Sequence, residues 1–214
     1  MLVRALDVFH VVAPEDEGVA AVPGDDDPAG GDAIGAALEL EAVPVHAESY
    51  IGLVEAGVGL LPAGGGLKEI AVRASEAAGP GGDVFAELKK TFETVAMAKV
   101  STSAVEAKEL GLLRAGDRIA FNAYELLHIA RAEARGLAEA GHRPPLPARR
   151  IRVAGDVGIA TFRMLLVNML EGRFISEYDD EIATRIATVL CGGEVDRGAT
   201  VDEDWLLRLE RRHF

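Results

Sequence analysis

The spacing of apolar side chains predicts two neighbouring helices in the middle of the chain. One face of the first helix carries four apolar residues, Leu67, Ile70, Ala71 and Ala74. The "GPGG" at 79–82 ends this helix, because proline and successive glycines interrupt the helical backbone. The second helix repeats apolar residues at the same spacing, at Phe85, Leu88, Phe92 and Val95, and Asp83 is its predicted N-cap.

Capping and turn residues predict the elements that follow. In "STSAVEAKELGLL", Ser103 and Glu106 have the spacing of a capping box, and Gly111 is suited to the left-handed turn after a helix. The amphipathic stretch 118–141 predicts one long helix closed by Gly141.

The last third of the chain alternates between a proline-rich segment and further helical patterns. "HRPPLPARR" predicts an extended linker, because its prolines exclude a helix. Two helices separated near "GRFIS" follow, and Ser176 is the predicted N-cap of the second, whose first turn is acidic. The final pattern, "VDEDWLLRLERRHF", predicts a last helix.

The start of the chain has a different character. "VFHVV" indicates a strand within residues 1–12, and the Pro, Gly and Asp residues of 13–34 indicate a linker or loop. We therefore predict an irregular segment at 1–34, a first domain at 35–141 and a helical C-terminal extension at 142–214. The pattern alone predicts an α/β or α-rich fold.

Composition narrows the function classes. The net charge of −13 argues against a nucleic-acid binder, which needs clustered Lys and Arg. The single cysteine, Cys191, excludes an internal disulfide and is interpreted as a small buried thiol. No signal peptide or bilayer-length apolar run is evident, so we expect a soluble, cytoplasmic protein.

No metal site is predicted. The five histidines are scattered without the spacing of metal ligands. The acidic cluster Glu177, Asp179, Asp180 and Glu181 is interpreted as the solvated start of a helix.

The stretch "YIGLVEAGVGLLPAGGGLKE" at 50–69 holds the main candidate for chemistry. Glu55 is a single carboxylate in an aliphatic, glycine-rich run, and burial there would raise its pKa toward neutral pH. The alternative is a carboxylate at the edge of a loop, facing solvent. The triplet Gly64, Gly65 and Gly66 could also form a phosphate-binding turn at a helix N-terminus, although no Walker-type Lys-Ser/Thr follows it.

This stretch and the later "KVSTSAVEAKELGLL" resemble the crotonase (enoyl-CoA hydratase/isomerase) superfamily. Residues 47–214 are more narrowly similar to the C-terminal crotonase part of long bifunctional 3-hydroxyacyl-CoA dehydrogenases of fatty-acid β-oxidation. The segments that show this likeness are "AESYIGLVEAGVGLLPAGGG", "RPPLP", "GRFISEYDDEIA" and "VLCGGEV". The resemblance implies the back half of a crotonase-like ββα fold, followed by a helical C-terminal region.

The resemblance also implies site roles. Crotonases polarise an acyl-CoA thioester and stabilise the resulting enolate, and hydratases hold a water between two glutamates. Glu55 matches the second glutamate, which exchanges the proton at Cα. The backbone N–H of Ala63 matches the amide that positions the water, and Gly64, Gly65 and Gly66 form the turn into the next helix.

The chain departs from the family upstream of Glu55. Counting back to the place of the first glutamate leads to Gly35, whereas Glu39 and Glu41 lie too near and the pair Gly30 and Gly31 is at most a displaced remnant of the oxyanion turn. No G-x-G-x-x-G fingerprint of an NAD-binding domain occurs.

Three functions therefore remain open at this point. The chain is an enoyl-CoA hydratase or single-acid isomerase acting on acyl-CoA without a cofactor of its own, a catalytically incomplete packing or partner-binding fragment, or an anion- or CoA-binding module. The resemblance further implies trimer-like self-association or association with a dehydrogenase.

Overall fold

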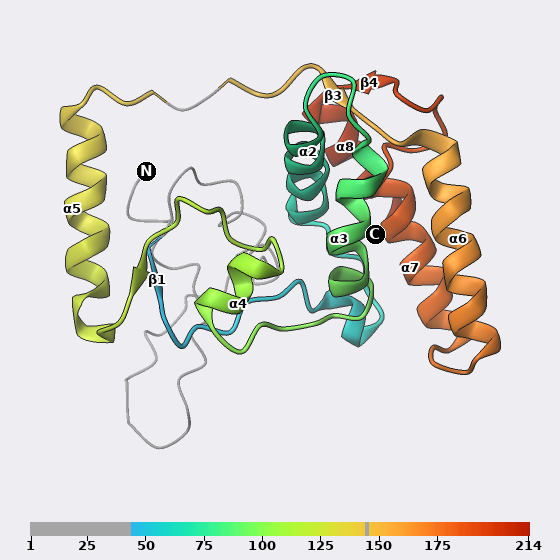
Figure 1. Ribbon diagram of the computed structural model, residues 1–214, viewed down its shortest axis with the longest axis horizontal. Helices are drawn as coiled ribbons and strands as arrows, with labels where there is room; N and C mark the ends of the chain where they lie inside the picture. The colour runs from blue at the N-terminus through green and yellow to red at the C-terminus, as the bar shows by residue number, and fades with distance from the viewer. Residues whose placement is uncertain (1–43, 144–145) are drawn as a thin grey trace.

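The computed structural model describes residues 44–143 and 146–214, which form a helix-rich mixed architecture with short strands (Figure 1). The helices are α2 (Gly66–Ala78), α3 (Val84–Ala96), α4 (Ala104–Glu109), α5 (Leu126–Glu139), α6 (Gly155–Glu171), α7 (Glu177–Leu190) and α8 (Glu203–His213). Two one-turn 3-10 helices are η2 (Glu55–Val58) and η3 (Ala123–Glu125). The strands are β1 (Val45–His46), β2 (Ile119–Ala120), β3 (Ile151–Arg152) and β4 (Thr200–Val201).

The main hydrophobic core lies in a bundle of α2, α3, α6, α7 and α8, on the right in Figure 1. At its centre the fully buried Phe162 of α6 stacks on Phe92 of α3, with ring centroids 4.0 Å apart. Phe85 packs against the same ring at 4.7 Å. Helices from the early and the late parts of the described residues thus share one core, to which Ile151 of the antiparallel strand pair β3–β4 also belongs.

Helices α6 and α7 approach each other closely where α6 has a glycine. A Cβ added at Gly158 would lie 2.8 Å from the Cys191 sulfur, so a larger residue would separate the helices. Cys191 is fully buried, and burial raises its pKa to about 12. The prediction of a buried structural thiol is confirmed.

A second, smaller core lies beside the first. It contains Val45, Ile51, Ala104, Ala107, Leu112 and Leu113. Here β1 pairs in parallel with β2, so that Val45 lies opposite Ile119. The long segment between these strands includes α2, α3 and α4, and the pairing therefore ties the start of the described chain to residues beyond α4.

Most predicted helices and caps are confirmed. The Asp83 side chain accepts a hydrogen bond from the Phe85 N–H, and Ser103 accepts one from the Glu106 N–H. Ser176 and Asp179 form a complete capping box at the start of α7. The Glu106 carboxylate differs in detail, because it accepts from the N–H and hydroxyl of Thr102 instead of the Ser103 backbone.

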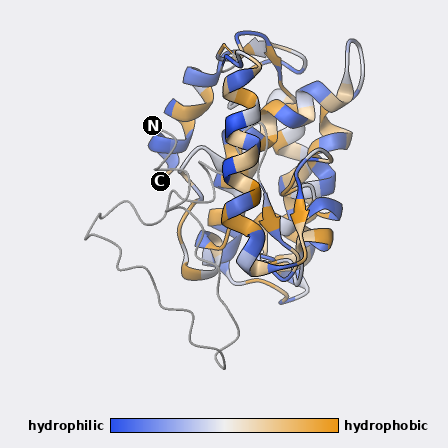
Figure 2. Ribbon diagram, turned by 90° about the vertical axis from the view of Figure 1, so that its left-hand side faces the viewer, coloured by the Kyte–Doolittle hydropathy of each residue, from blue (hydrophilic) through white to orange (hydrophobic). Residues whose placement is uncertain are grey.

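The predicted long helix over 118–141 is wrong in its first part. Ile119 and Ala120 belong to β2, and Asn122 caps the 3-10 turn that precedes α5 at Leu126. Tertiary strand pairing overrides the helical pattern there. Helix α5 lies on the left in Figure 1, apart from the bundle, and Figure 2 shows hydrophobic and hydrophilic residues alternating along the helices.

The fold class is therefore mixed and rich in helix. The strands within 44–143 and 146–214 form two separate two-stranded pairs, and the back half of a crotonase-like ββα fold stays a prediction. The strand expected within 1–12, the linker at 13–34 and the candidates Gly30, Gly31, Gly35, Glu39 and Glu41 lie outside the described residues. Within that described part, none of the helices combines the length and the apolar character that crossing a bilayer requires.

Candidate functional site

Glu55 begins the one-turn helix η2 on the surface of the bundle. It is partly buried, and its carbonyl accepts a hydrogen bond from the Leu60 N–H at 3.0 Å. The turn ends at Gly59, whose φ of 78° is left-handed. Ala56 packs against the main core, so η2 is anchored to the bundle while the Glu55 carboxylate lies at its edge.

Several residues close to Glu55 in the sequence have exposed apolar side chains. Tyr50, Val54, Val58 and Leu60 are all exposed, and Val58 is 76% exposed. We call these four residues the Glu55 apolar surface. Burying such side chains against an acyl chain or another protein surface would be favourable by about 25 cal/mol per Å² of apolar area.

The Gly-rich turn connects Leu61 and Pro62, both buried, to α2. Gly65 is the N-cap and has a φ of 91°, a conformation that glycine adopts without strain. A Cβ on Gly66 would lie 2.9 Å from a Leu53 methyl carbon, so this glycine permits close packing. Ala63 is half-buried and packs against the main core, as does Ala56 on the other side of the motif.

A glutamate from the last helix occupies the N-terminus of α2. The Glu210 carboxylate is fully buried and accepts the Gly65 N–H at 2.9 Å and the Lys68 N–H at 2.7 Å. An anion bound to this turn would need the same N–H groups and would meet a negative charge. This arrangement argues against the phosphate-binding interpretation of the glycine triplet.

Charged residues next to this cap are also buried. Lys68 and Glu69 are 3% and 5% exposed, and their side chains lie 3.6 Å apart. Glu69 pairs with Arg73 at 2.9 Å and with Arg114 at 2.5 Å, whereas Lys68 lies 3.7 Å from Glu203. These ion pairs connect α2 with α8 and with the segment after α4, and they fix the helix that follows the Gly-rich turn.

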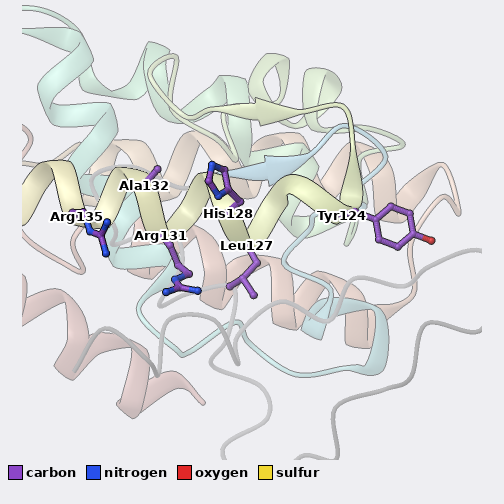
Figure 3. A pocket seen from close by; sticks show the side chains of 6 residues that line it. All are labelled: Tyr124, Leu127, His128, Arg131, Ala132 and Arg135. Atoms are coloured by element: carbon purple, nitrogen blue, oxygen red, sulfur yellow. The ribbon is translucent and has the colours of Figure 1, made fainter.

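A surface hollow of about 450 Å³ lies along η3 and α5, not at Glu55. Figure 3 shows the side chains that line it, which are Tyr124, Leu127, His128, Arg131, Ala132 and Arg135. All six come from one short stretch of chain. None of them belongs to the predicted site around Glu55.

The structure shows no metal centre among residues 44–143 and 146–214. The acidic cluster that begins at Glu177 forms the first turn of α7, and hydrogen bonds from the Ser176 backbone and hydroxyl lower the pKa of Asp179. His213 lies at the end of α8, where burial and the nearby Arg185 and Arg212 lower its pKa.

Glu210 is the residue that sequence reasoning missed. Its signal is a charge on the apolar face of an amphipathic helix, since Leu206 and Leu209 on the same face are buried. Tyr178 was also missed. Its hydroxyl donates to the Gly59 carbonyl at 3.0 Å, and a Cβ on Gly59 would lie 2.7 Å from its ring.

The described residues form a helix-rich protein in which a partly buried carboxylate precedes a glycine-rich helix start in the chain. The chain is 41% identical over 179 residues to the "Probable 3-hydroxyacyl-CoA dehydrogenase" of Bacillus subtilis strain 168. This match covers 84% of the chain but spans only 22% of the relative. No family model matches the chain, and no solved structure gave a significant match.

Proposed function

We propose that the chain acts on acyl-CoA thioesters of fatty-acid β-oxidation, with Glu55 as the residue that transfers a proton at Cα. The observation that carries this proposal is the 41% identity to a protein named for 3-hydroxyacyl-CoA oxidation. The sequence lacks a G-x-G-x-x-G fingerprint, so we assign to this chain the crotonase-like step and not the NAD-linked step. The proposed fold is the back half of a crotonase-like domain.

The chemistry follows from one carboxylate beside an apolar surface. In hydration, a water oxygen bonds to Cβ of the enoyl thioester, its proton goes to a base, and Glu55 protonates Cα. In isomerisation, Glu55 takes the proton from Cα of a 3-enoyl thioester and returns it at the γ carbon. The second reaction needs a single acid, which is what the Glu55 turn offers. The Ala63 N–H is proposed to position the water or the acyl group.

The Glu55 apolar surface supports the substrate class. Its exposed Val54, Val58 and Leu60 lie within five residues of Glu55 in the chain and offer apolar area that an acyl chain could cover. A carboxylate partly removed from water is also suited to proton transfer near neutral pH.

The test is a spectrophotometric assay of the whole chain with crotonyl-CoA and with a 3-enoyl-CoA. Glu55→Gln removes the proton-transfer group while keeping the shape, and we expect it to lower kcat by about 10²–10⁴-fold. The matched control is Glu48→Gln, because Glu48 is exposed and precedes the candidate stretch at 50–69. Activity that survives in Glu55→Gln would remove Glu55 from the mechanism.

The same apolar surface favours a second candidate, a packing module without chemistry. Its four exposed residues would then be covered by another protein surface, such as a second copy or a dehydrogenase part. Absence of turnover, combined with self-association in light scattering that Val58→Ser reduces, would favour this candidate. Calorimetry with CoA distinguishes it from a CoA-binding module.

A further inference from the structure

The two oxygens of Glu210 complete a helix cap that the local sequence does not supply. In an ordinary capping box, side chains near the helix start accept the N–H groups of the N-cap and N3 residues. Here those positions are Gly65 and Lys68, and glycine has no side chain with which to cap. One oxygen of Glu210 accepts each N–H, at 2.9 and 2.7 Å, from a residue 142–145 positions away.

This contact is buried in the protein interior. Glu210 is 0% exposed, and Leu67 beside it is also fully buried. The positive end of the α2 dipole favours the carboxylate there, and charge-assisted hydrogen bonds to backbone N–H groups are among the stronger ones. The position of the α2 start is therefore tied to α8.

Besides this cap, a second contact anchors the chain within the Glu55–Ala63 motif. Gly65 is two residues after Ala63, and Pro62, which precedes Ala63, is buried. Within the motif, four residues after Glu55, the Tyr178 hydroxyl of α7 donates to the Gly59 carbonyl at 3.0 Å. Helices α7 and α8 thus hold residues 59–65, which include Ala63, at both ends.

We infer that Glu210 is a positioning residue for the candidate site: it sets the Gly-rich turn, and through it the direction of the Ala63 N–H relative to Glu55. This inference rests on the proposed function. It assigns to the C-terminal helices a role in site geometry, with Tyr178 as the second anchor.

The decisive variant is Glu210→Gln. A glutamine has one acceptor oxygen and an NH₂ group, so it can accept only one of the two backbone N–H groups and presents a donor to the other. Because misplacement by about 1 Å can cost up to about 10²-fold in rate, we expect kcat to fall by about 10–100-fold. The KM should change by less than about twofold, because the group lost acts on the reacting geometry.

The matched control is Leu206→Ala, which damages the same helix at a fully buried position one turn before Glu210. Both variants are assayed at a temperature where circular dichroism shows each to be folded. Leu206→Ala is expected to keep the wild-type kcat. Equal loss of kcat in both variants would reduce Glu210 to a general stabilising role and overturn the inference.

Amide hydrogen exchange by NMR tests the contact without any assay. In Glu210→Gln, the Gly65 and Lys68 amides should exchange at least about tenfold faster, while the amides of α6 stay protected. Unchanged exchange at both amides would overturn the inference. If the wild type turns over neither thioester, the proposed function fails, and with it the role of Glu210 in activity; the exchange rates then decide separately whether Glu210 holds the turn.

A second variant avoids the risk that Glu210→Gln does not fold. Tyr178→Phe removes only the hydroxyl that bonds to Gly59, and Tyr178 is 56% exposed. It is expected to lower kcat in the same direction by a smaller factor, with KM unchanged. Full activity in Tyr178→Phe, together with wild-type protection of the Gly65 amide from exchange in Glu210→Gln, would refute the two-sided anchoring.

Discussion

The helices of the bundle and helix α5 are all amphipathic, but they differ in whether their apolar face is buried. Each of α2, α3, α6, α7 and α8 buries a set of apolar side chains in the main core. Helix α5 has a comparable apolar stripe, yet none of its residues Leu126–Glu139 is buried. Leu127 and Leu137 on α5 are exposed.

This difference shows that amphipathic spacing alone does not determine whether a helix contributes to the core. A helix in water is marginal without tertiary contacts, and most of its stability comes from a packed face. We therefore expect the bundle to unfold as one cooperative unit and α5 to open locally with a much lower free energy.

The largest expected effect comes from the centre of the bundle. Phe162→Ala removes a fully buried ring that stacks on Phe92, and it should lower the free energy of unfolding by about 3–5 kcal/mol. The matched change on α5 is Leu127→Ala, for which we expect less than about 0.5 kcal/mol. Urea denaturation followed by circular dichroism measures both, and similar losses would show that α5 is part of the same cooperative core.

The turn that begins α6 is expected to give the next largest effect. Gly155 has a φ of 63°, and an added Cβ would collide with the Val195 carbonyl oxygen. Gly155→Ala should therefore cost about 3 kcal/mol, from backbone strain and overpacking together.

Gly198→Ala is the control for that variant. Gly198 has a φ of 81° but nothing within 4 Å of the added Cβ, so only backbone strain of about 1 kcal/mol applies. Equal losses of stability in the two variants would mean that the close contact with the 195–196 backbone contributes nothing.

How much the sequence predicts depends on whether the cause is local. The apolar faces of α2 and α3, the end of α2 at "GPGG" and the caps Asp83, Ser103 and Ser176 follow from neighbours within one helical turn, and the structure confirms them. The predicted helix start at 118 is wrong because Ile119 pairs with Val45, which is far away in the chain.

The candidate site divides in the same way. The Gly-rich turn before α2 could be predicted from "PAGGG", but its cap could not, because Glu210 is 145 residues from Gly65 and reaches it only through folding. The roles of Glu55 and Ala63 stay predictions, since they rest on resemblance and not on a packing rule.

A smaller effect of opposite sign is expected in α5. Gly136 lies near the C-terminal end of this helix with nothing within 4 Å of an added Cβ. Gly136→Ala should stabilise the helix by about 0.5–1 kcal/mol, because alanine loses less backbone entropy. We expect slower amide exchange within α5 and an unchanged unfolding midpoint of the bundle. A higher bundle midpoint would contradict the independence of the two regions.

The smallest effect concerns pH and the cap of α4 in the second core. Hydrogen bonds from the hydroxyl and N–H of Thr102 lower the pKa of Glu106 to about 2, from an ordinary value of 4.5. Because the folded-state pKa is depressed, the stabilisation from this carboxylate is present above about pH 4.5 and is lost as the pH falls toward 2.

Thr102→Val removes the hydroxyl donor and should raise the Glu106 pKa toward its ordinary value, as measured by NMR titration of the carboxyl carbon. Asp179, whose pKa the Ser176 hydrogen bonds lower at the start of α7, is the internal reference and should titrate unchanged in this variant. A Glu106 pKa that stays near 2 in Thr102→Val would assign the shift to the backbone N–H and Lys99 instead of the hydroxyl.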